Sequence, residues 1–392
     1  MKKTRVSVVS CPEYDHPRIY PALKRAIELI GGLSDQINQH KRVLVKINHL
    51  PPASPAEKGI VTHPVFVEAV LSLLKETGAQ ITLGDDIESG AKDGYRISGF
   101  RQMSERAGVE LINLREAGFV EVECRGSLLQ KVCVSRACLE ADVIVNLPKF
   151  KAHALTVFTG CVKNMYGVIP AGLRTRFHGE YPKREDFGRV IVDIFAVVRP
   201  QLNIMDGIVA MEGEGPACGD LRKLGIVLAG WDAVALDAVA TKIVGLEPLV
   251  VATTRLADER GLGVGDLKRI AVLGEKLEDV TVTDFRLPTG TSTALMERMP
   301  GFLSRFVLDQ CSVKPRVARD KCTGCLACQV ACPKSAISGD NDGVTIDRAA
   351  CIGCLCCLEV CRYGAVTPQR SLMGSAFELA SRSWQRLMAC AR

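Results

Sequence analysis

The chain has 392 residues, of which 47% are hydrophobic and 24% are charged. This composition excludes a disordered chain and a scaffold held only by disulfides, and it supplies apolar side chains for about two or three domains. The formal net charge is +6, from 50 Lys and Arg against 44 Asp and Glu. Because this excess is small and evenly spread, no nucleic-acid partner is expected.

The 17 cysteines are the most unusual feature of the composition. Their number is odd and many lie near one end of a long chain, which favours metal-bound thiolates in a reducing compartment over a disulfide framework. The apolar stretch behind the positive N-terminus is interrupted by Pro12 and Glu13, so no signal peptide is expected. No apolar run is long enough for a membrane span. We therefore expect a cytoplasmic protein.

Short β-branched runs alternate with stretches of helical spacing from residue 4 to about 285. This alternation predicts an α/β domain over residues 1–285, with a mostly parallel sheet and flanking helices. A helix is expected at 65–75, because Pro64 stands at its first turn and Gly78 follows its end. Strands are expected at residues 6–9, 43–47, 81–83, 111–114, 143–145, 204–205, 226–228 and 270–273.

Polar residues stand at the ends of four of these strands: Asn48, Asp85, Asn146 and Asp206. In open α/β sheets, ligands bind in the crevice beyond the carboxyl ends of the strands. We therefore expect these four side chains to contribute to the wall of a site.

A dense polar stretch follows the strand at 143–145 and contains Lys149, Lys151, His153, Lys163 and Asn164. These residue types can form a cationic pocket that holds an anionic group or stabilises a developing oxyanion. The alternative is a solvated basic loop. Large apolar residues alternate with the polar ones here, which is unusual in a solvated loop and favours the pocket.

Residues 205–216 combine three carboxylates, among them Asp206 and Glu212, with glycines and a proline, and are interpreted as a loop. Such carboxylates can accept protons, bind a divalent cation or pair with the lysines, and the alternative is a simple turn. Neither a phosphate-binding Gly-x4-Gly-Lys-Ser/Thr run nor a Gly-x-Gly-x-x-Gly run opening a helix is present. Nucleotide hydrolysis and the usual types of flavin or NAD binding therefore lose support.

A cysteine-rich repeat occupies residues 316–368, where Cys322, Cys325, Cys328 and Cys332 recur 29 positions later. The first run ends in Pro333 and has the spacing of bacterial [4Fe–4S] loops, in which the fourth cysteine ligates the other cluster. Zinc is the alternative for any Cys-x2-Cys pair, but the doubled pattern of eight thiolates disfavours it. We predict two [4Fe–4S] clusters, one held by Cys322, Cys325, Cys328 and Cys361, the other by Cys351, Cys354, Cys357 and Cys332.

This module resembles a two-cluster bacterial ferredoxin domain, and the resemblance implies a small α+β fold and a role in electron transfer. The second run departs from the family pattern, because Arg362 and Tyr363 follow Cys361 where a proline is expected. Cys356 adjoins Cys357, but only Cys357 keeps the register of the repeat. Cys356 is therefore interpreted as a spare buried thiol.

Two segments flank the module. Residues 286–315 contain three prolines and are expected to form a connector around one helix at 295–307. Residues 369–392 carry a broad apolar stripe and are expected to form an amphipathic helix. Docking over the module is the favoured role of this helix, and contact with a membrane surface is the alternative.

Three elements of the large domain, Lys-x-Lys-x-His, Lys-Asn-x-x-Gly and Glu-Gly-x-Gly-Pro, begin at Lys149, Lys163 and Glu212. In these elements the domain resembles the family with the domain of unknown function DUF362, whose members often carry an appended two-cluster ferredoxin module. The resemblance implies a shared α/β fold and ferredoxin-linked redox chemistry. It places the polar positions of the family on Lys46, Lys149, Lys151, His153, Lys163, Asn164, Asp206, Glu212, Asp232 and Asp237.

The leading hypothesis is an iron–sulfur reductase that exchanges electrons with a soluble donor or acceptor protein and acts on a small anionic or carbonyl-bearing substrate. The candidate catalytic residues are Lys151, His153, Lys163 and Glu212. Substrate binding is expected at Lys46, Asn48, Lys149, Asn164 and Asp206. The alternative is a non-catalytic electron-transfer or assembly subunit, whose large domain docks a partner enzyme or senses a metabolite.

Other residues have mainly structural interpretations. Asp232 is expected to cap a helix at 233–244, and Cys161 is more readily a buried thiol than an activated thiolate. His49, His63 and His178 are interpreted as loop or capping residues rather than ligands.

The cluster assignment predicts the metal content of the protein. Anaerobically purified protein should be brown and contain about eight irons, because two cubanes hold four irons each. Elemental analysis and visible absorption measure this directly. A colourless preparation that carries zinc would overturn the assignment.

Overall fold

The structure is a computed structural model that describes residues 3–33, 36–50, 53–87, 93–289, 314–353, 355–361 and 363–369. Most of the expected connector, with its helix at 295–307, lies outside the described residues. The expected amphipathic helix also lies outside them, apart from Gln369, which ends a strand.

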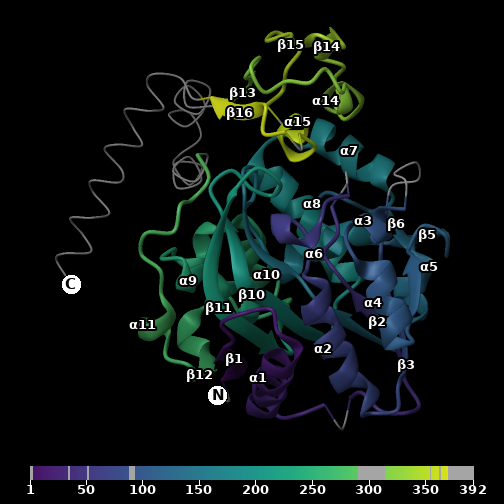
Figure 1. The fold of residues 1–392 in the computed structure, drawn as a ribbon, viewed down its shortest axis with the longest axis vertical. Coiled ribbons are helices and arrows are strands. Elements are labelled where there is room, and N and C mark those ends of the chain that lie inside the picture. Colours follow the sequence, from purple (N-terminus) through teal and green to yellow (C-terminus); the bar gives the residue numbers. More distant parts are fainter. Residues whose placement is uncertain are drawn as a thin grey trace.

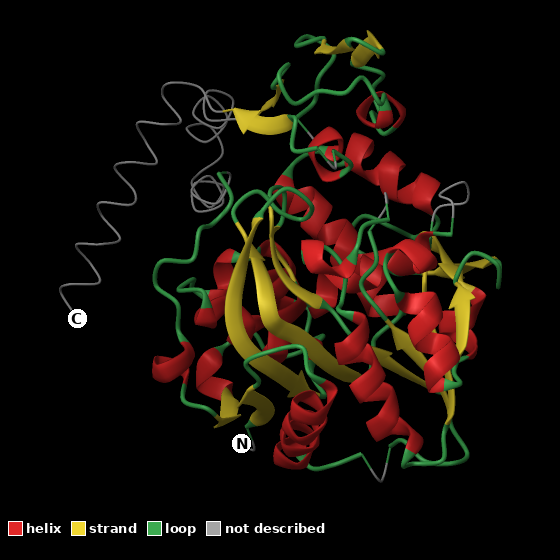
Figure 2. Cartoon of the chain, viewed as in Figure 1, coloured by secondary structure: helices red, strands yellow, loops and turns green. Residues whose placement is uncertain are grey.

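A ten-stranded sheet forms the centre of the large domain (Figures 1 and 2). Its main path runs in the order β12-β1-β11-β10-β7-β2-β3-β4, and β8 and β9 attach beside β10. Neighbours along this path are parallel except where β11 pairs with β1 and β10. The strands are β1 (Thr4–Ser10), β2 (Arg42–Lys46), β3 (Gln80–Asp85), β4 (Glu110–Asn113), β7 (Val143–Asn146), β8 (Lys149–His153), β9 (Val157–Thr159), β10 (Leu202–Glu212), β11 (Asp220–Gly230) and β12 (Ile270–Gly274).

Helices cover both faces of this sheet, and a separate hairpin of β5 (Phe119–Glu123) and β6 (Lys131–Ser135) stands at one side. The helices are α1 (His16–Ile30), α2 (Pro64–Lys75), α3 (Gly94–Ile97), α4 (Phe100–Ala107), α5 (Arg136–Glu140), α6 (Cys161–Asn164), α7 (Ala171–Glu180), α8 (Arg184–Val197), α9 (Ala233–Ile243), α10 (Ala252–Glu259) and α11 (Leu277–Val280). Short 3-10 turns occur at Ala56–Lys58, Met165–Val168, Pro248–Val250 and Leu267–Arg269. The predicted α/β class is confirmed.

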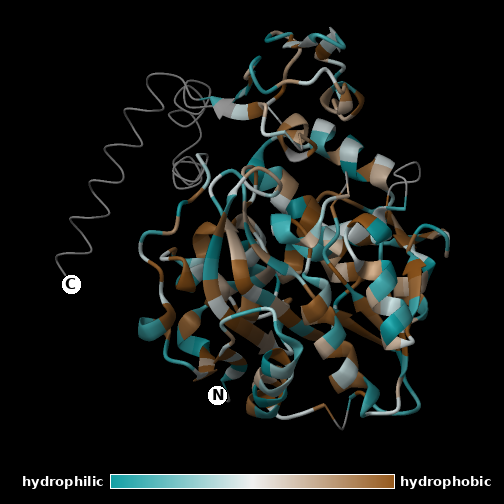
Figure 3. Ribbon diagram, viewed as in Figure 1, coloured by the Kyte–Doolittle hydropathy of each residue, from teal (hydrophilic) through white to brown (hydrophobic). Residues whose placement is uncertain are grey.

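The core has two parts, one on each face of the sheet. Along β2, Val43 and Val45 pack with α1, α2 and α4, whereas Leu44 between them packs on the other side with α8, α9 and α10. This division follows from the alternation of side chains along a strand. Apolar residues accordingly gather where the helices face the sheet (Figure 3).

The interpretation of residues 205–216 as a loop is wrong for its first half, because β10 continues to Glu212 and pairs with β11 as a long antiparallel hairpin. Asp206 and Gly207 have low strand propensity and obscured this strand in the sequence. The pairing register shifts between Gly207 and Val209, which is the irregularity that such residues accommodate.

The C-terminal module contains two antiparallel strand pairs and two one-turn helices: β13 (Lys314–Val317), α14 (Ala327–Val330), β14 (Ile337–Asp340), β15 (Gly343–Ile346), α15 (Cys356–Glu359) and β16 (Val366–Gln369). The sequence repeat is also a backbone repeat. Gly324 and Gly353 both have positive φ, as do Leu326 and Leu355, which precede the two helices. Only a repeated loop geometry places left-handed residues at matching positions.

The module packs on the large domain through α15. Figure 1 shows α15 next to α7, while the β14–β15 pair lies at the far end of the molecule. Cys218, in the β10–β11 connection, donates from its thiol to the carbonyl oxygens of Cys361 at 2.9 Å and Leu358 at 3.6 Å. Ala154 of the large domain joins the apolar core of the module.

One buried carboxylate ties the β5–β6 connection to α8. Asp193 is fully buried and accepts hydrogen bonds from the backbone N–H groups of Ser127, Leu128 and Leu129 at 2.8–3.0 Å. Arg260 pairs with the same carboxylate at 2.6 Å.

The Asp193→Ala substitution should therefore lower the free energy of unfolding by about 3–5 kcal/mol, because it leaves buried donors and a cation without their acceptor. Asp284→Ala is the matched control. It removes an exposed ion pair with Arg222 and should cost no more than about 1 kcal/mol. Chemical denaturation of both variants measures the difference, and equal losses would refute this account.

Candidate functional site

A cavity of about 450 Å³ lies between the carboxyl edge of the sheet and the C-terminal module. The ends of β2 and β3, strand β8, and helices α6 and α7 supply one wall, and α14 and α15 supply the other. Asp85 lines it, and so do six of the candidate catalytic and substrate-binding residues: Lys46, Asn48, Lys151, His153, Lys163 and Asn164. The cavity opens at the carboxyl ends of the strands, which is where ligands bind in open α/β sheets.

A buried ion pair stands at the base of this cavity. Lys46 Nζ lies 2.8 Å from Asp85 Oδ2 and donates to the carbonyl oxygen of Ile47 at 2.8 Å. Asp85 also accepts from the backbone N–H of His49 at 2.8 Å. A Cβ at Gly167 would lie 3.0 Å from Lys46 Nζ, so the glycine of the Lys-Asn-x-x-Gly element leaves room for the pair.

Four buried asparagines form a directed chain of hydrogen bonds. The amide of Asn48 donates to Asn164 at 2.8 Å, Asn164 donates to Asn146 at 2.7 Å, and Asn146 donates to Asn203 at 2.9 Å. Each Nδ2 in this chain donates to the next Oδ1, which fixes the orientation of Asn48 in the cavity wall. No described residue donates to Asn48 Oδ1, or bonds to Oγ1 of Thr159 in the same wall. Because buried polar atoms are normally hydrogen-bonded, these two atoms indicate a polar ligand.

His153 is held in one tautomer. Its Nδ1 accepts from the backbone N–H groups of Leu155 at 3.1 Å and Thr156 at 3.3 Å, so Nε2 carries the proton of the neutral ring. Beside it on the same face of β8, Lys151 donates to the carbonyl oxygen of Ile60 at 2.7 Å. The pair therefore places two N–H donors in the cavity wall.

Lys163 and α7 complete the polar lining. Lys163 Nζ lies 5.8 Å from the ring centroid of Tyr166, within range of a cation–π contact. Arg174 and His178 line the cavity four residues apart on α7, and Arg174 pairs with Asp86 behind it. That spacing places both on one helix face and was the available signal for them in the sequence.

His49 lies in a loop and His63 caps α2 by accepting from Val65 N–H at 3.3 Å, as expected, whereas His178 lies within helix α7. His49 and His178 also line the cavity. Burial lowers the pKa of His49 to about 4, so this ring is neutral at physiological pH.

Helix α6, which carries Lys163 and Asn164, is anchored by Asp237. The carboxylate accepts from the N–H groups of Cys161 at 2.6 Å and Val162 at 3.0 Å. Burial raises the pKa of Asp237 to about 7, although these two donors act in the opposite direction. Burial also raises the pKa of the Cys161 thiol, and Asp237 adds to this shift, so Cys161 is a buried thiol.

Three expected site residues do not line the cavity. Lys149 Nζ pairs with Asp206 at 2.8 Å and contacts the hydroxyl of Tyr14 at 2.5 Å, and that hydroxyl donates to Asp206 at 2.7 Å. Glu212 pairs with Arg286 at 2.9 Å. Lys149 and Asp206 are register partners, so their ion pair joins β8 to β10 rather than facing a ligand.

Three of the predicted cluster ligands line a narrow space of about 20 Å³ in the module. Cys332, Cys351 and Cys357 line it together with Cys356, while Cys354 lies outside the described residues. The N–H of Ala336 donates to Cys332 Sγ at 3.2 Å. Three of the four predicted ligands thus face one space, as a cubane requires, because each thiolate binds a different iron.

Three residues of the first predicted ligand set, Cys325, Cys328 and Cys361, lie near one another. Burial raises the pKa of the Cys328 thiol, and the neighbouring thiols of Cys361 and Cys325 add to the effect. Among the described residues, no three His, Cys, Asp or Glu side chains converge as they would on a single metal ion. The residues present fit the predicted clusters.

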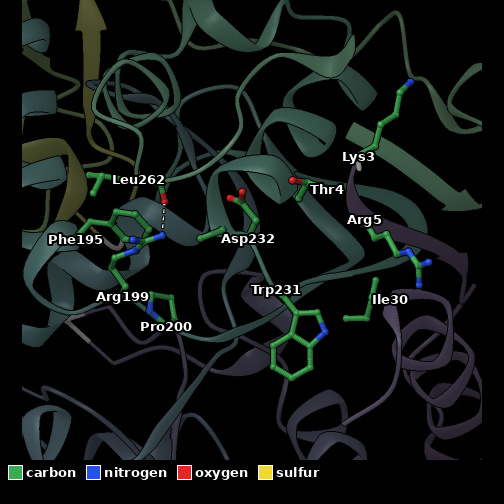
Figure 4. A pocket seen from close by; sticks show the side chains of 11 residues that line it. Lys3, Thr4, Arg5, Ile30, Phe195, Arg199, Pro200, Trp231, Asp232 and Leu262 are labelled. Atoms are coloured by element: carbon green, nitrogen blue, oxygen red, sulfur yellow. Dashed lines mark hydrogen bonds between the residues drawn. The ribbon is translucent and has the colours of Figure 1, made fainter. Parts of the chain in front are cut away.

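A further cavity of about 440 Å³ opens at the amino edge of the sheet (Figure 4). Lys3, Arg5, Arg199 and Trp231 line it, and Arg199 donates to the carbonyl oxygen of Leu262 at 2.6 Å. Asp232 also lies there and caps α9 as expected, accepting from two backbone N–H groups. None of the candidate catalytic residues faces this cavity.

The architecture is that of an α/β protein with an appended iron–sulfur module. Residues 43–242 match the family described as domain of unknown function DUF362, and residues 314–362 match a 4Fe-4S dicluster domain. The chain is 30% identical over 314 residues to the thylakoid-associated protein sll1697 of Synechocystis sp., covering 77% of this chain and 95% of that protein. The chain belongs to the DUF362 family.

Similar solved structures are more distant. The lactate racemase apoprotein of Thermoanaerobacterium thermosaccharolyticum has a TM-score of 0.41 at 12% identity, over 59% of this chain and 54% of that one. A Thermotoga maritima protein has a TM-score of 0.34 at 18% identity, over 52% of each chain. The chain thus spans about half the length of both, and such likeness carries no inference about activity. In the part of the chain that the structure describes, no helix has the length and apolar character needed to cross a bilayer.

The raised pKa of Asp237 predicts a pH dependence. Between the usual value of 3.8 and about 7, the folded protein binds a proton that the unfolded chain has released. The contribution of this group to stability therefore falls as the pH rises through that window. Asparagine does not titrate, so the stability advantage of the wild type over Asp237→Asn should shrink from pH 4 to pH 7, as measured by denaturant unfolding. A pH-independent difference would show that Asp237 is ionised throughout.

Proposed function

We propose that the protein is an iron–sulfur reductase, in which two [4Fe–4S] clusters deliver single electrons to a small anionic or carbonyl-bearing substrate in the large cavity between the sheet and the module. The observation that carries this proposal is the composition of the cavity wall. Lys151 and His153 of the large domain face the same space as α14 and α15, the helices that carry Cys328 and Cys357. A reducible group held there lies next to the source of electrons.

The charges of the lining favour an anionic ligand. Among the described residues, four cations line the cavity, Lys46, Lys151, Lys163 and Arg174, against the single carboxylate of Asp85. Burial of cations in a low-dielectric wall strengthens their attraction for an anion. Asn48 Oδ1 adds an acceptor, which suits a ligand that also carries an O–H or N–H group.

The residues of the wall have separate tasks in this proposal. Lys151 binds or polarises the substrate oxygen, and Lys163 holds its anionic group. His153 donates a hydrogen bond from Nε2 to the oxygen as it gains electron density. Reduction of a carbonyl to an alcohol consumes two electrons and two protons, and both protons come from solvent.

Lys149, Asp206 and Glu212 serve the fold of this site in our proposal. The Lys149–Asp206 pair joins the strand that carries Lys151 and His153 to the centre of the sheet. Glu212, at the end of β10, holds Arg286 and so fixes the start of the segment that leads to the module.

The electron partner docks on the module in this proposal. Tyr363 is a large apolar side chain that the described part of the module leaves exposed, at 46%, and it does not line the large cavity. Exposed apolar groups are typical of transient protein contacts. The same observation supports the second candidate function, in which the protein only relays electrons to a partner enzyme. The relative named as thylakoid-associated is compatible with a partner at a membrane surface.

Two substitutions separate the two functions. Lys151→Met and His153→Gln should leave the clusters reducible by dithionite but lower substrate-dependent reoxidation by about 100-fold or more, because they remove a polarising cation and the imidazole that donates a hydrogen bond to the substrate oxygen. Lys131→Met, in an exposed pair with Glu121 on the separate hairpin, is the control and should behave like the wild type. Stopped-flow absorbance with a panel of small oxoacids and inorganic anions measures reoxidation. Unchanged rates in both cavity variants would favour the relay function.

A further inference from the structure

Cys356 belongs to the walls of both the module cavity and the large cavity. It lines the narrow space of the module with Cys332, Cys351 and Cys357, and it also lines the large cavity that Lys151 faces. Among the described residues, no other is shared by these two linings. Cys356, which was interpreted from the sequence as a spare buried thiol, therefore lies between the second cluster site and the candidate substrate.

The repeat gives this position a natural comparison. The residue 29 positions earlier is Ala327, which lines the large cavity but not the module cavity. Ala331 and Val360, also 29 positions apart, both line the large cavity. The two helices thus present matching faces to the cavity. At the compared position the first repeat has the methyl group of Ala327 and the second has the thiol of Cys356.

The Cys322–Cys325 loop of the first cluster site lies away from the large domain, although Cys361 of that set accepts from the Cys218 thiol. A Cβ at Gly324 would lie 2.3 Å from the carbonyl oxygen of Asn341, so this loop packs on the β14–β15 turn. Figure 1 shows that turn at the end of the molecule opposite the sheet. In the second site, by contrast, Pro333 beside Cys332 packs on α7, because a Cβ at Gly179 would lie 2.9 Å from Pro333 Cβ.

We propose that the second cluster site, of which Cys332, Cys351 and Cys357 are described, is the one that faces the substrate, and that Cys356 is the positioning residue between them. This inference rests on the proposed function and adds the order in which electrons pass the two cluster sites. Electrons enter at the distal site of Cys322, Cys325, Cys328 and Cys361, and leave from the proximal site. A polarisable thiol next to a cluster also tunes its reduction potential, as neighbouring hydrogen-bond donors do.

Redox titration of the cluster-loaded full-length chain, followed by EPR, tests this order without turnover. Cys356→Ala should shift the midpoint potential of one cluster and leave the other unchanged. Cys325→Ser, which alters a ligand of the distal site, identifies the distal signal. Ala327→Cys places a thiol at the matching position of the other repeat and should leave the proximal signal unchanged. Cys356→Ser retains a polar donor and should give a smaller shift than Cys356→Ala.

A change of charge in the large cavity provides a second, independent test of the cluster order. Lys151→Met removes a cation from the large cavity, so it should lower the midpoint potential of the proximal cluster more than that of the distal one. Lys131→Met should change neither potential.

Equal shifts of both clusters, or a larger shift of the distal cluster, would overturn the assignment. Loss of iron from both Cys356 variants would also overturn it, because Cys356 would then be a ligand. These midpoint potentials are measured without substrate. They can therefore refute the proposed order of the two clusters even if the protein is not a reductase.

Discussion

The organisation of the cavity depends on the need to compensate charges and amides buried at the carboxyl edge of the sheet. Lys46 is fully buried, and its pairing with Asp85 satisfies a charge that would otherwise be too costly to remove from water. The asparagine chain from Asn48 to Asn203 meets the same requirement for neutral groups. Each group is oriented by its neighbour, so the wall is preorganised before any ligand arrives.

Much of the fold follows from local patterns in the sequence. The alternation of β-branched runs with helical stretches predicted the parallel sheet, and Pro64 predicted the start of α2. The hairpin of β10 and β11 escaped prediction, since Asp206 and Gly207 weaken the strand pattern in its middle. Pairing with a strand many residues away overrides that local preference.

The sequence indicated which residues gather near the site better than it indicated how they are arranged. Lys149 and Lys151 lie two residues apart on the same face of β8, yet only Lys151 reaches the cavity. What separates them is Tyr14, which is 192 residues from Asp206 in the chain and completes the buried cluster around Lys149. Spacing within one strand cannot reveal a partner so distant in sequence. The cysteine ligands were accessible because their chemistry imposes a local spacing.

The left-handed backbone at Leu326 and Leu355 has a consequence for the fate of the protein in air. Residues with a side chain adopt this conformation at an energetic cost, which metal–thiolate bonds in the adjoining loops can offset. Oxidative loss of iron would release both loops and, with them, the short helices that wall the large cavity. Oxygen damage would therefore remove one wall of the large cavity, and the lysines that line it would become exposed to solvent.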